Sequence, residues 1–250
     1  MKLDFSGKTA ILTGGASGMA LLTAQEMARR GANVVLADYN GASAEEAAAK
    51  IREAGGKAAA FQVDVRDWHQ VEDCVKFTEE TFGKVDILLN AAGGNSSRMC
   101  QDDWQFENIK YETLEWGIGV NLRGALYFAR AVMPLMVKNQ HGVIINMSSV
   151  DGVTGSAASV EYAASKAGLI GMTKSLALYG ASRGIRSVAI APGPVLTRPA
   201  MANMKTPMGR AAEVIEVVNL ILFLSSENSA YISGTCVSID GARSCGGSEK

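Results

Sequence analysis

Short apolar runs alternate with amphipathic helical patterns along this chain, and this alternation constrains the fold more than any other feature. Residues 9–12 form an apolar run that passes through a glycine turn into a helical pattern over residues 18–30. Strands that alternate with helices require right-handed crossovers between parallel neighbours. The sequence therefore predicts an α/β fold, a doubly wound parallel sheet of about seven strands with helices on both faces.

The expected elements follow one another without a long interruption until residue 90. The expected strands are 9–12, 34–38, 58–63, 85–90, 143–147, 186–191 and 236–239. The expected helices are 18–30, 44–54, 68–82, 114–138, 160–178 and 211–224. A capping box at Ser43 and Glu46 is expected to begin the second helix.

The 250 residues carry no linker, repeat or low-complexity tract, so one domain over residues 1–250 is expected. Two stretches without a regular pattern, 94–113 and 192–209, follow the carboxyl ends of expected strands. Ligands bind at that edge of open α/β sheets, so these stretches are interpreted as substrate loops. The small polar residues 244–250 are expected to form a flexible tail.

The charge balance excludes several classes of partner. Lys and Arg number 24 against 25 Asp and Glu, a net charge of −1, with no basic run for nucleic acid or for a membrane surface. The two histidines, His69 and His141, have no ligand-spaced partners, so no metal is expected. The four cysteines are too far apart for a disulfide framework, and the first residues contain no apolar leader segment. A protein of the reducing cytoplasm is the expectation.

A glycine turn marks a candidate nucleotide site. Gly14 and Gly18 lie between the first strand and the first helix, where backbone N–H groups at a helix start suit a pyrophosphate. Asp38 ends the second strand 20 residues after Gly18, where a carboxylate can accept hydrogen bonds from ribose hydroxyls. This carboxylate repels a 2′-phosphate, and neither Ser17 nor Tyr39 supplies a compensating cation. NAD is therefore favoured over NADP.

A phenol and an ammonium one helical turn apart mark a candidate acid/base site. Tyr162 and Lys166 project from the same face of an expected helix, and a cation near a phenol favours the phenolate. Ser149 lies just beyond the carboxyl end of the strand 143–147, where its hydroxyl can hydrogen-bond a substrate oxygen. Together these groups predict proton exchange between Tyr162 and a substrate hydroxyl.

In these motifs the chain resembles the short-chain dehydrogenase/reductase family, from about Lys8 to Gly241. The resemblance implies a Rossmann-like fold, a nicotinamide cofactor and a catalytic set formed by Asn121, Ser149, Tyr162 and Lys166. It places Asp64 and Val65 beside adenine, Asn90, Ala91 and Gly93 near the adenine ribose, and residues 192–197 against the nicotinamide amide. The cofactor-binding residues so implied are Gly14, Ser17, Gly18, Met19, Asp38, Tyr39, Asp64, Val65, Asn90, Ala91, Gly93, Tyr162, Lys166, Pro192, Gly193, Val195 and Thr197.

Two residues depart from the family pattern. Ala20 stands where the cofactor loop usually has its last glycine, which adds a methyl group between helix and cofactor. Ala242 replaces a frequent glycine after Asp240 and Gly241. Neither departure removes a catalytic group.

The resemblance also implies the reaction, which is hydride transfer between a carbinol carbon and C4 of the nicotinamide. In the oxidation direction Tyr162 takes the hydroxyl proton, Ser149 orients the oxygen, and Lys166 lowers the pKa of Tyr162 and binds the nicotinamide ribose. Asn121 is expected to anchor a water that leads from Lys166 to solvent. The family commonly forms tetramers, so a homotetramer is implied.

The substrate is the least determined feature of the sequence. The loop 95–110 is rich in hydrogen-bonding side chains, which favours a sugar, polyol or sugar acid, with contacts expected from Asn95, Ser149, Asp151 and Tyr162. The apolar loop 198–209 keeps a hydroxysteroid as the alternative. A 3-oxoacyl-[acyl-carrier-protein] reductase is a further alternative, weakened because Gln140 stands where a cation is expected. A non-catalytic NAD-binding scaffold is remote, since all four catalytic groups are present.

Overall fold

The computed structural model describes residues 3–204 and 206–246. In this part of the chain seven parallel strands form one sheet in the order β3-β2-β1-β4-β5-β6-β7, which confirms the predicted fold class. The strands are β1 (Thr9–Thr13), β2 (Asn33–Asp38), β3 (Lys57–Gln62), β4 (Ile87–Asn90), β5 (Gly142–Met147), β6 (Ile185–Pro192) and β7 (Cys236–Ile239).

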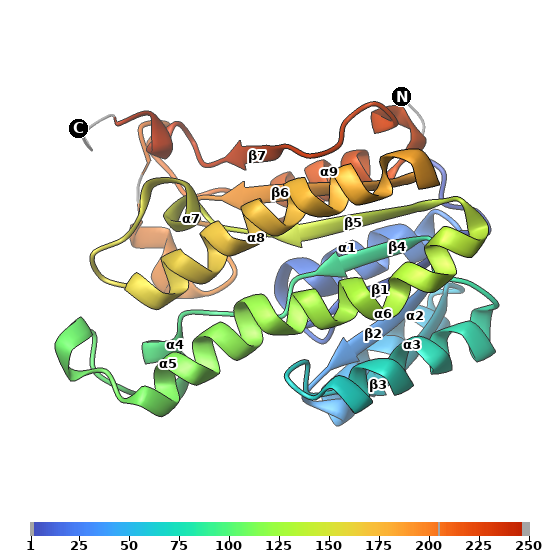
Figure 1. Ribbon diagram of the computed structural model, residues 1–250, viewed down its shortest axis with the longest axis horizontal. Helices are drawn as coiled ribbons and strands as arrows, with labels where there is room; N and C mark the ends of the chain where they lie inside the picture. The colour runs from blue at the N-terminus through green and yellow to red at the C-terminus, as the bar shows by residue number, and fades with distance from the viewer. Residues whose placement is uncertain (1–2, 205, 247–250) are drawn as a thin grey trace.

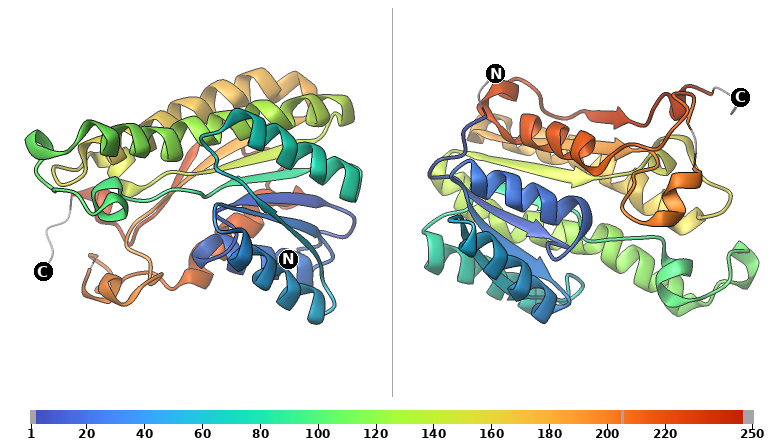
Figure 2. Two further views of the ribbon diagram at one scale, coloured as in Figure 1. Left: turned by 90° about the horizontal axis from the view of Figure 1, so that it is seen from below. Right: turned by 180° about the vertical axis from the view of Figure 1, so that it is seen from behind.

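The longer helices cover the sheet on both faces (Figure 1). They are α1 (Gly18–Arg29), α2 (Gly41–Glu53), α3 (Trp68–Phe82), α5 (Tyr111–Ile118), α6 (Gly124–Asn139), α8 (Val160–Gly180) and α9 (Val214–Ser225). Helices α3, α6 and α8 form one layer, and α1, α2 and α9 form the other (Figure 2). Leu12 and Leu36 pack into the core under α1, α2 and α9, whereas Ile11 and Val35 face the opposite core. Successive strand residues point to opposite faces, so each buried strand contributes to both cores.

The starts of α2 and α9 differ from those expected from the sequence, because capping side chains determine where each helix begins. The predicted capping box at Ser43 and Glu46 is wrong, because the side chain of Asn40 caps α2 and accepts the Ser43 N–H at 3.0 Å. Helix α9 begins three residues later than predicted. There Glu213 and Glu216 form a capping box in which the Glu216 carboxylate accepts the Glu213 N–H at 2.8 Å.

The predicted helix 114–138 is present within one helical run over residues 111–139. It consists of α5 and α6 joined by a π-helical turn, Gly119–Arg123. Each of the two expected substrate loops also contains short elements. The first holds α4 (Ser96–Cys100) and the 3-10 turn Phe106–Asn108, and the second holds the 3-10 turn Pro199–Asn203. A further short helix, α7 (Val150–Thr154), follows β5. These short elements lack enough turns to produce a periodic pattern, so sequence analysis missed them.

The expected flexible tail begins in an ordered turn. Residues Arg243–Cys245 form a 3-10 turn, and the Asp240 carboxylate accepts the Ser244 N–H at 2.8 Å. Residues 247–250, the rest of the predicted tail, lie outside the described part. Over the described residues, no helix is both long and apolar enough to cross a membrane.

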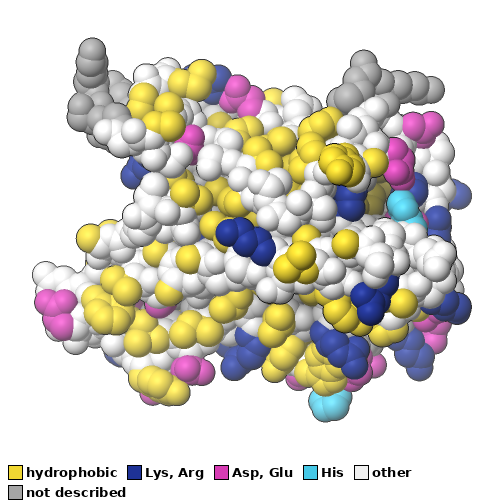
Figure 3. Space-filling model, turned by 45° about the horizontal axis from the view of Figure 1, so that its top comes forward, with side chains coloured by type: hydrophobic (Ala, Val, Ile, Leu, Met, Phe, Trp, Pro, Cys, Tyr) yellow, Lys and Arg dark blue, Asp and Glu magenta, His cyan; other side chains and the backbone are white. Residues whose placement is uncertain are grey.

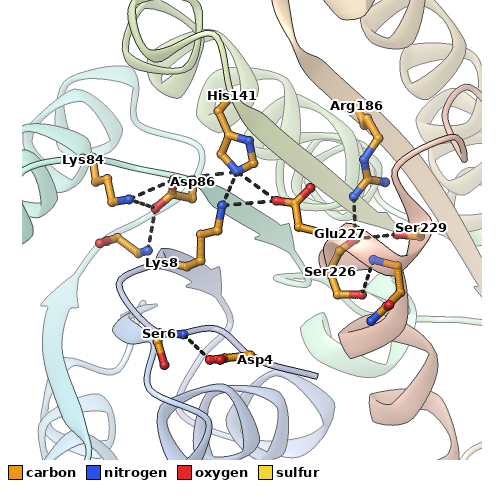
Figure 4. Close-up of polar contacts among 12 residues, drawn as sticks. Asp4, Ser6, Lys8, Lys84, Asp86, His141, Arg186, Ser226, Glu227 and Ser229 are labelled. Atoms are coloured by element: carbon orange, nitrogen blue, oxygen red, sulfur yellow. Dashed lines mark hydrogen bonds and ion pairs between the residues drawn. The ribbon is translucent and has the colours of Figure 1, made fainter. Parts of the chain in front are cut away.

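A polar cluster closes the amino end of the sheet, opposite the edge that carries the candidate site (Figure 4). Asp86 is buried and accepts the Thr9 N–H at 2.8 Å, while the Lys84 ammonium lies 3.1 Å from the same carboxylate. The Lys8 ammonium lies 2.8 Å from His141 Nε2 and 3.2 Å from a Glu227 oxygen. These contacts tie the start of β1 to the segments before β4 and β5, and so fix the register of the central strands.

We predict that Asp86→Ala destabilises the protein by about 2 kcal/mol, because it leaves the buried Thr9 N–H without its acceptor. Urea unfolding followed by circular dichroism measures the change. The control is Asp73→Ala on the exposed side of α3, which should alter stability by no more than about 0.5 kcal/mol. Equal midpoints for the two variants would contradict the role given to Asp86.

Candidate active site

The carboxyl ends of β1 and β4 are neighbours in the sheet, although the chain leaves them toward opposite faces. Such a switch point opens a crevice between the loops that follow the two strands. A cavity of about 560 Å³ lies there. Eleven of the residues implied as cofactor ligands line it: Gly14, Ser17, Gly18, Met19, Asp38, Tyr39, Asp64, Val65, Ala91, Gly93 and Thr197.

The glycine turn fits a pyrophosphate. Gly14 has a φ of +66°, and a Cβ at this residue would lie 3.1 Å from Ala92 Cα, so a side chain is excluded on both grounds. Ser17 is the N-cap of α1, yet its side chain makes no capping hydrogen bond. The N–H groups of the first turn are therefore open toward the cavity, where an anion can accept them.

Two carboxylates, those of Asp38 and Asp64, line the cavity near the carboxyl ends of β2 and β3. Asp38 accepts the Ala16 N–H at 3.0 Å and the Asn40 N–H at 2.9 Å, which holds its carboxylate beside the glycine turn. Arg66 also lines the cavity, a residue that sequence analysis missed. Its guanidinium is engaged by Asp64, with Nη2 to Oδ2 at 2.6 Å, and this pairing lowers the pKa of Asp64.

Lys166 ties α8 to the carboxyl end of β5. Its ammonium donates to the carbonyl of Met147 at 2.7 Å, and the hydroxyl of Ser148 donates to the carbonyl of Lys166 at 2.8 Å. The Lys166 residue is only 4% exposed, and burial lowers its pKa to about 8. These two hydrogen bonds place the first turn of α8, with Tyr162, over the segment that follows β5.

Ser149 lies close to Tyr162 in the structure. Ser149 caps α7, its oxygen accepts the Asp151 N–H at 3.2 Å, and its side chain is near enough to the Tyr162 phenol to favour the ionised form of that phenol. Burial raises the pKa of Tyr162, while the Ser149 hydrogen bond and the charges of Arg98 and Arg198 partly oppose this rise. The phenol is therefore a buried acid whose ionisation depends on its hydrogen bond and on nearby charges.

The expected influence of Lys166 on the pKa of Tyr162 stays a prediction. The Lys166 ammonium lies 5.5 Å from the centre of the Tyr162 ring and donates to the Met147 carbonyl. In the structure, Lys166 thus positions α8.

Asn121 lies in the π-helical turn between α5 and α6, an irregularity that often marks functional sites. Its amide donates to the carbonyl of Gly94 and accepts the N–H of Gly94, both at 2.9 Å. A Cβ at Gly93 would lie 2.4 Å from Asn121 Oδ1 and 3.4 Å from Lys166 Nζ. The residue between these two functional groups must therefore be a glycine. The expected water beside Asn121 stays a prediction.

Several implied cofactor residues lie beside the cavity without lining it. Asn90 donates to Asn146 Oδ1 at 2.9 Å, although its own Oδ1 has no partner in the described part of the chain. A Cβ at Gly193 would lie 2.8 Å from Asp240 Cα, so this glycine lets β6 approach the loop after β7. The others that do not line the cavity are Tyr162, Lys166, Pro192 and Val195. Their contacts with a cofactor stay predictions.

The side chains of Asn95 and Asp151, both expected to contact the substrate, have different surroundings in the structure. Both ends of the Asn95 amide are used within the protein, since it accepts the Arg98 N–H at 2.9 Å and donates to Ser159 Oγ at 2.6 Å. Asp151 is half-buried near Tyr162, and burial raises its pKa while the charge of Arg243 opposes the rise. Asn95 thus anchors the start of α4, and the contacts of Asn95 and Asp151 with a substrate stay predictions.

The two residues that depart from the family pattern are both accommodated. Ala20 is buried and lines the nucleotide cavity. Ala242 adopts a φ of +69°, a left-handed conformation that explains why glycine is common at this position.

In the described residues no group of three or more His, Cys, Asp and Glu side chains could hold a metal ion. The described cysteines are free thiols, and burial raises the pKa of Cys74 to about 12.

Comparison with known proteins identifies the family of this chain. A family described as short chain dehydrogenase matches residues 8–207. The chain is 35% identical to 3-oxoacyl-[acyl-carrier-protein] reductase FabG of Thermotoga maritima, covering 96% of this chain and 98% of the relative. It is 31% identical to 7alpha-hydroxysteroid dehydrogenase of Bacteroides fragilis, and the match covers 95% of this chain and 94% of the relative. It is 35% identical to 2,5-dichloro-2,5-cyclohexadiene-1,4-diol dehydrogenase LinX of Sphingobium indicum, and the match covers 96% of this chain and 98% of the relative.

The fold has a solved counterpart as well. The crystal structure of gox2181 superimposes with a TM-score of 0.90 at 29% identity and covers 97% of this chain and 98% of that one. The chain therefore belongs to the short-chain dehydrogenase family, which uses a nicotinamide cofactor. It is an oxidoreductase of the kind that acts on an alcohol or a ketone.

Proposed function

We propose that this protein transfers a hydride between NAD and a secondary alcohol or the corresponding ketone, with Tyr162 as the proton-exchanging group. The observation that carries the proposal is the proximity of the Ser149 side chain to the Tyr162 phenol, where it opposes the rise in the pKa of that phenol. Gly93 links the two regions, because it lines the cavity and a Cβ there would lie 3.4 Å from Lys166 Nζ. A hydroxyl pair at this place can hold a substrate oxygen next to a nicotinamide.

Each of these residues has a separate role in the proposed reaction. The bound cofactor supplies the ring carbon that accepts or donates the hydride. In the oxidation direction Tyr162 removes the proton of the substrate hydroxyl, and in the reduction direction it returns that proton. Ser149 donates a hydrogen bond to the substrate oxygen and holds it against the phenol. Lys166, whose ammonium donates to the Met147 carbonyl, keeps α8 in place and would bind the ribose of a nicotinamide cofactor.

The preference for NAD over NADP rests on charge. Asp38 places a carboxylate beside the glycine turn, where it can bind ribose hydroxyls and repels a 2′-phosphate. Arg66 is the cation at this end of the cavity, but Asp64 holds its guanidinium through both Nε and Nη2. A 2′-phosphate would have to break this pairing to gain a cation.

The first substrate class proposed is a sugar, polyol or sugar acid, supported by Asp151 beside the phenol. A hydroxysteroid and a 3-oxoacyl thioester are the alternatives, and relatives whose names carry these activities support keeping both. The non-catalytic scaffold is disfavoured because the described structure brings Asn121, Ser149, Tyr162 and Lys166 to one edge of the sheet.

We predict nicotinamide reduction with NAD, and much less with NADP, for one class among sugars, sugar acids, polyols, hydroxysteroids and 3-hydroxyacyl thioesters. Tyr162→Phe should lower kcat/KM by about 100-fold or more, because it removes the proton acceptor, while calorimetry shows unchanged NAD binding. The control is Tyr179→Phe, an exposed tyrosine on the same helix, which should keep full activity. Near-normal turnover in Tyr162→Phe would refute the assignment.

We further propose that the chain works in the cytoplasm and self-associates as a homotetramer. Its free thiols support a reducing compartment. Exposed apolar side chains support self-association: Leu126 and Tyr179 border a hollow of about 910 Å³ over α6 and α8. Hydrophobic side chains also occur at many points of the face seen in Figure 3, with Lys and Arg between them.

Light scattering should therefore give about four times the chain mass of 26.3 kDa. Leu126→Glu should reduce this mass, since it places a charge on the apolar hollow. Glu115→Gln on α5 serves as the control and should leave the mass unchanged. A wild-type mass of a single chain at working concentration would contradict the proposal.

A further inference from the structure

The first turn of α8, which carries Tyr162, lacks the side-chain cap that often fixes the start of a helix. Ser159 is the N-cap, but its side chain accepts no N–H group of this turn. The Ser159 oxygen instead accepts a hydrogen bond from the Asn95 amide at 2.6 Å. The position of the turn therefore depends on contacts with the segment around α4, which follows β4.

Glu161, the residue before Tyr162, makes the second of these contacts. The Ser96 hydroxyl, at the start of α4, donates a hydrogen bond to Glu161 Oε1. Both residues are buried, since Ser96 is 0% exposed and Glu161 is 5% exposed. Burial keeps water from competing for either group, which strengthens the hydrogen bond. Glu161 is absent from the motifs that identify the family, and the proposed reaction gives it no role.

The two carboxylate oxygens of Glu161 have different surroundings. Oε2 is buried and has no hydrogen-bond partner in the described part of the chain. Burial of an unpaired carboxylate oxygen costs free energy, so the position gains nothing from Oε2. The hydrogen bond from Ser96 to Oε1 offsets this cost. The acceptor at Oε1 is therefore the feature of Glu161 that the arrangement uses.

Helix α5 packs directly against this pair. A Cβ at Gly117 would lie 2.9 Å from Ser96 Oγ and 3.2 Å from Glu161 Cγ, so a side chain there would displace the Ser96 hydroxyl. The Gly117 carbonyl accepts the Asn121 amide at 3.0 Å, and the same amide donates to the Gly94 carbonyl at 2.9 Å. The segments that hold Asn121 thus also enclose the pair.

Helix α4 reaches the nucleotide cavity as well. Met99, one turn after Ser96, lines this cavity together with Ala92 and Gly93. The contact between Ser96 and Glu161 therefore joins the helix that presents Tyr162 to the wall of the cavity. Proton exchange at a phenol and hydride transfer at a nicotinamide require a fixed separation between these two parts of the site.

We propose that Ser96 and Glu161 are positioning residues, whose hydrogen bond holds the first turn of α8 so that the Tyr162 phenol meets the substrate oxygen. The inference rests on the proposed function, because it gives the pair an effect on proton exchange at Tyr162. Both residues act through the backbone of α8 and not on the reacting atoms. Residue 161 has to supply a hydrogen-bond acceptor, and its negative charge is not required.

Three substitutions separate the hydrogen bond from the charge. Ser96→Ala removes the donor, Glu161→Ala removes the acceptor, and Glu161→Gln keeps an acceptor without the charge. The probes are glucose, gluconate, sorbitol, cholate and 3-hydroxybutyryl-CoA, and the comparison uses the one that wild type oxidises fastest with NAD. We expect kcat to fall about tenfold in each alanine variant and by no more than about twofold in Glu161→Gln. The KM of the substrate and the calorimetric binding of NAD should stay unchanged in all three.

Ser97→Ala is the matched control, because Ser97 is a neighbouring buried serine of α4. This variant should keep the kcat of wild type. The double variant with alanine at residues 96 and 161 should be no slower than either single variant, since all three lose the same hydrogen bond. If circular dichroism shows that Ser96→Ala does not fold, Ser96→Cys replaces it, because a thiol is a weak donor of similar size.

A measurement without turnover uses protein labelled with carbon-13 at the tyrosine ring carbon that bears the hydroxyl, and Tyr162→Phe identifies the resonance. We expect Ser96→Ala to broaden or split the Tyr162 resonance, because the first turn of α8 no longer keeps one position. Glu161→Gln and Ser97→Ala should leave a single narrow line.

The outcomes that overturn the proposal are distinct from those that overturn the function. Wild-type kcat in Ser96→Ala, or a loss in Glu161→Gln as large as in Glu161→Ala, overturns the positioning pair. Loss of NAD binding in Ser96→Ala also overturns it, because the pair would then serve the cofactor. If no probe is turned over above the Tyr162→Phe level, the proposed function fails. The Tyr162 resonance then still decides, since a single narrow line in Ser96→Ala overturns the pair by itself.

Discussion

The attachment of α8 to the carboxyl end of β5 is the contact on which the functional arrangement depends. A buried ammonium is costly unless it is hydrogen-bonded, and Lys166 meets this requirement by donating to the Met147 carbonyl. Ser148, the next residue, returns a hydrogen bond to the Lys166 carbonyl. The helix and the strand end are thus joined in both directions. Tyr162 lies one turn earlier on the helix and Ser149 one residue later on the strand, so the same attachment brings the two hydroxyls together.

The opposite wall of the site is held by amides instead of charges. The π-helical turn between α5 and α6 points the Asn121 side chain back at Gly94, where it uses both backbone groups. Deeper in the sheet, Asn146 accepts from Asn90 and donates to Thr173, each at 2.9 Å, which links β4, β5 and α8. The hydrogen bonds of Asn121 and Asn146 favour one arrangement of the elements they join. The loops after β4 and β5 are thereby held at a fixed separation.

The sequence predicts the elements that depend on local chemistry and periodicity. The strands, the long helices and the glycine turn each carry a pattern of several residues, and the Tyr162 and Lys166 spacing fixes their shared face. Contacts between distant segments have no such pattern. Asn40 displaced the expected cap at Ser43 because its own side chain accepts the Ser43 N–H. The buried direction of the Lys166 ammonium depends on a carbonyl 19 residues away in the sequence.

The charges that act on the Tyr162 phenol are another feature that the sequence alone does not predict. Arg98 and Arg198 are 100 positions apart in the sequence, and only the shared edge of the sheet brings both to Tyr162. The one sequence signal that they share is a position in the segments that follow β4 and β6. The ionisation of Tyr162 is likewise a property of the assembled site, because burial raises its pKa and Ser149 with the two arginines opposes the rise.

The most direct test of this account is a pH titration of Tyr162 by NMR in protein labelled with carbon-13 at the tyrosine ring carbon that bears the hydroxyl. Tyr162→Phe identifies the resonance. We expect Tyr162 to titrate above the usual tyrosine value of about 10, and to titrate still higher in Ser149→Ala, which loses the hydrogen bond that favours the phenolate. Titration at the usual value, unaffected by Ser149→Ala, would contradict the claim that burial and the Ser149 hydrogen bond govern the proton-exchanging group.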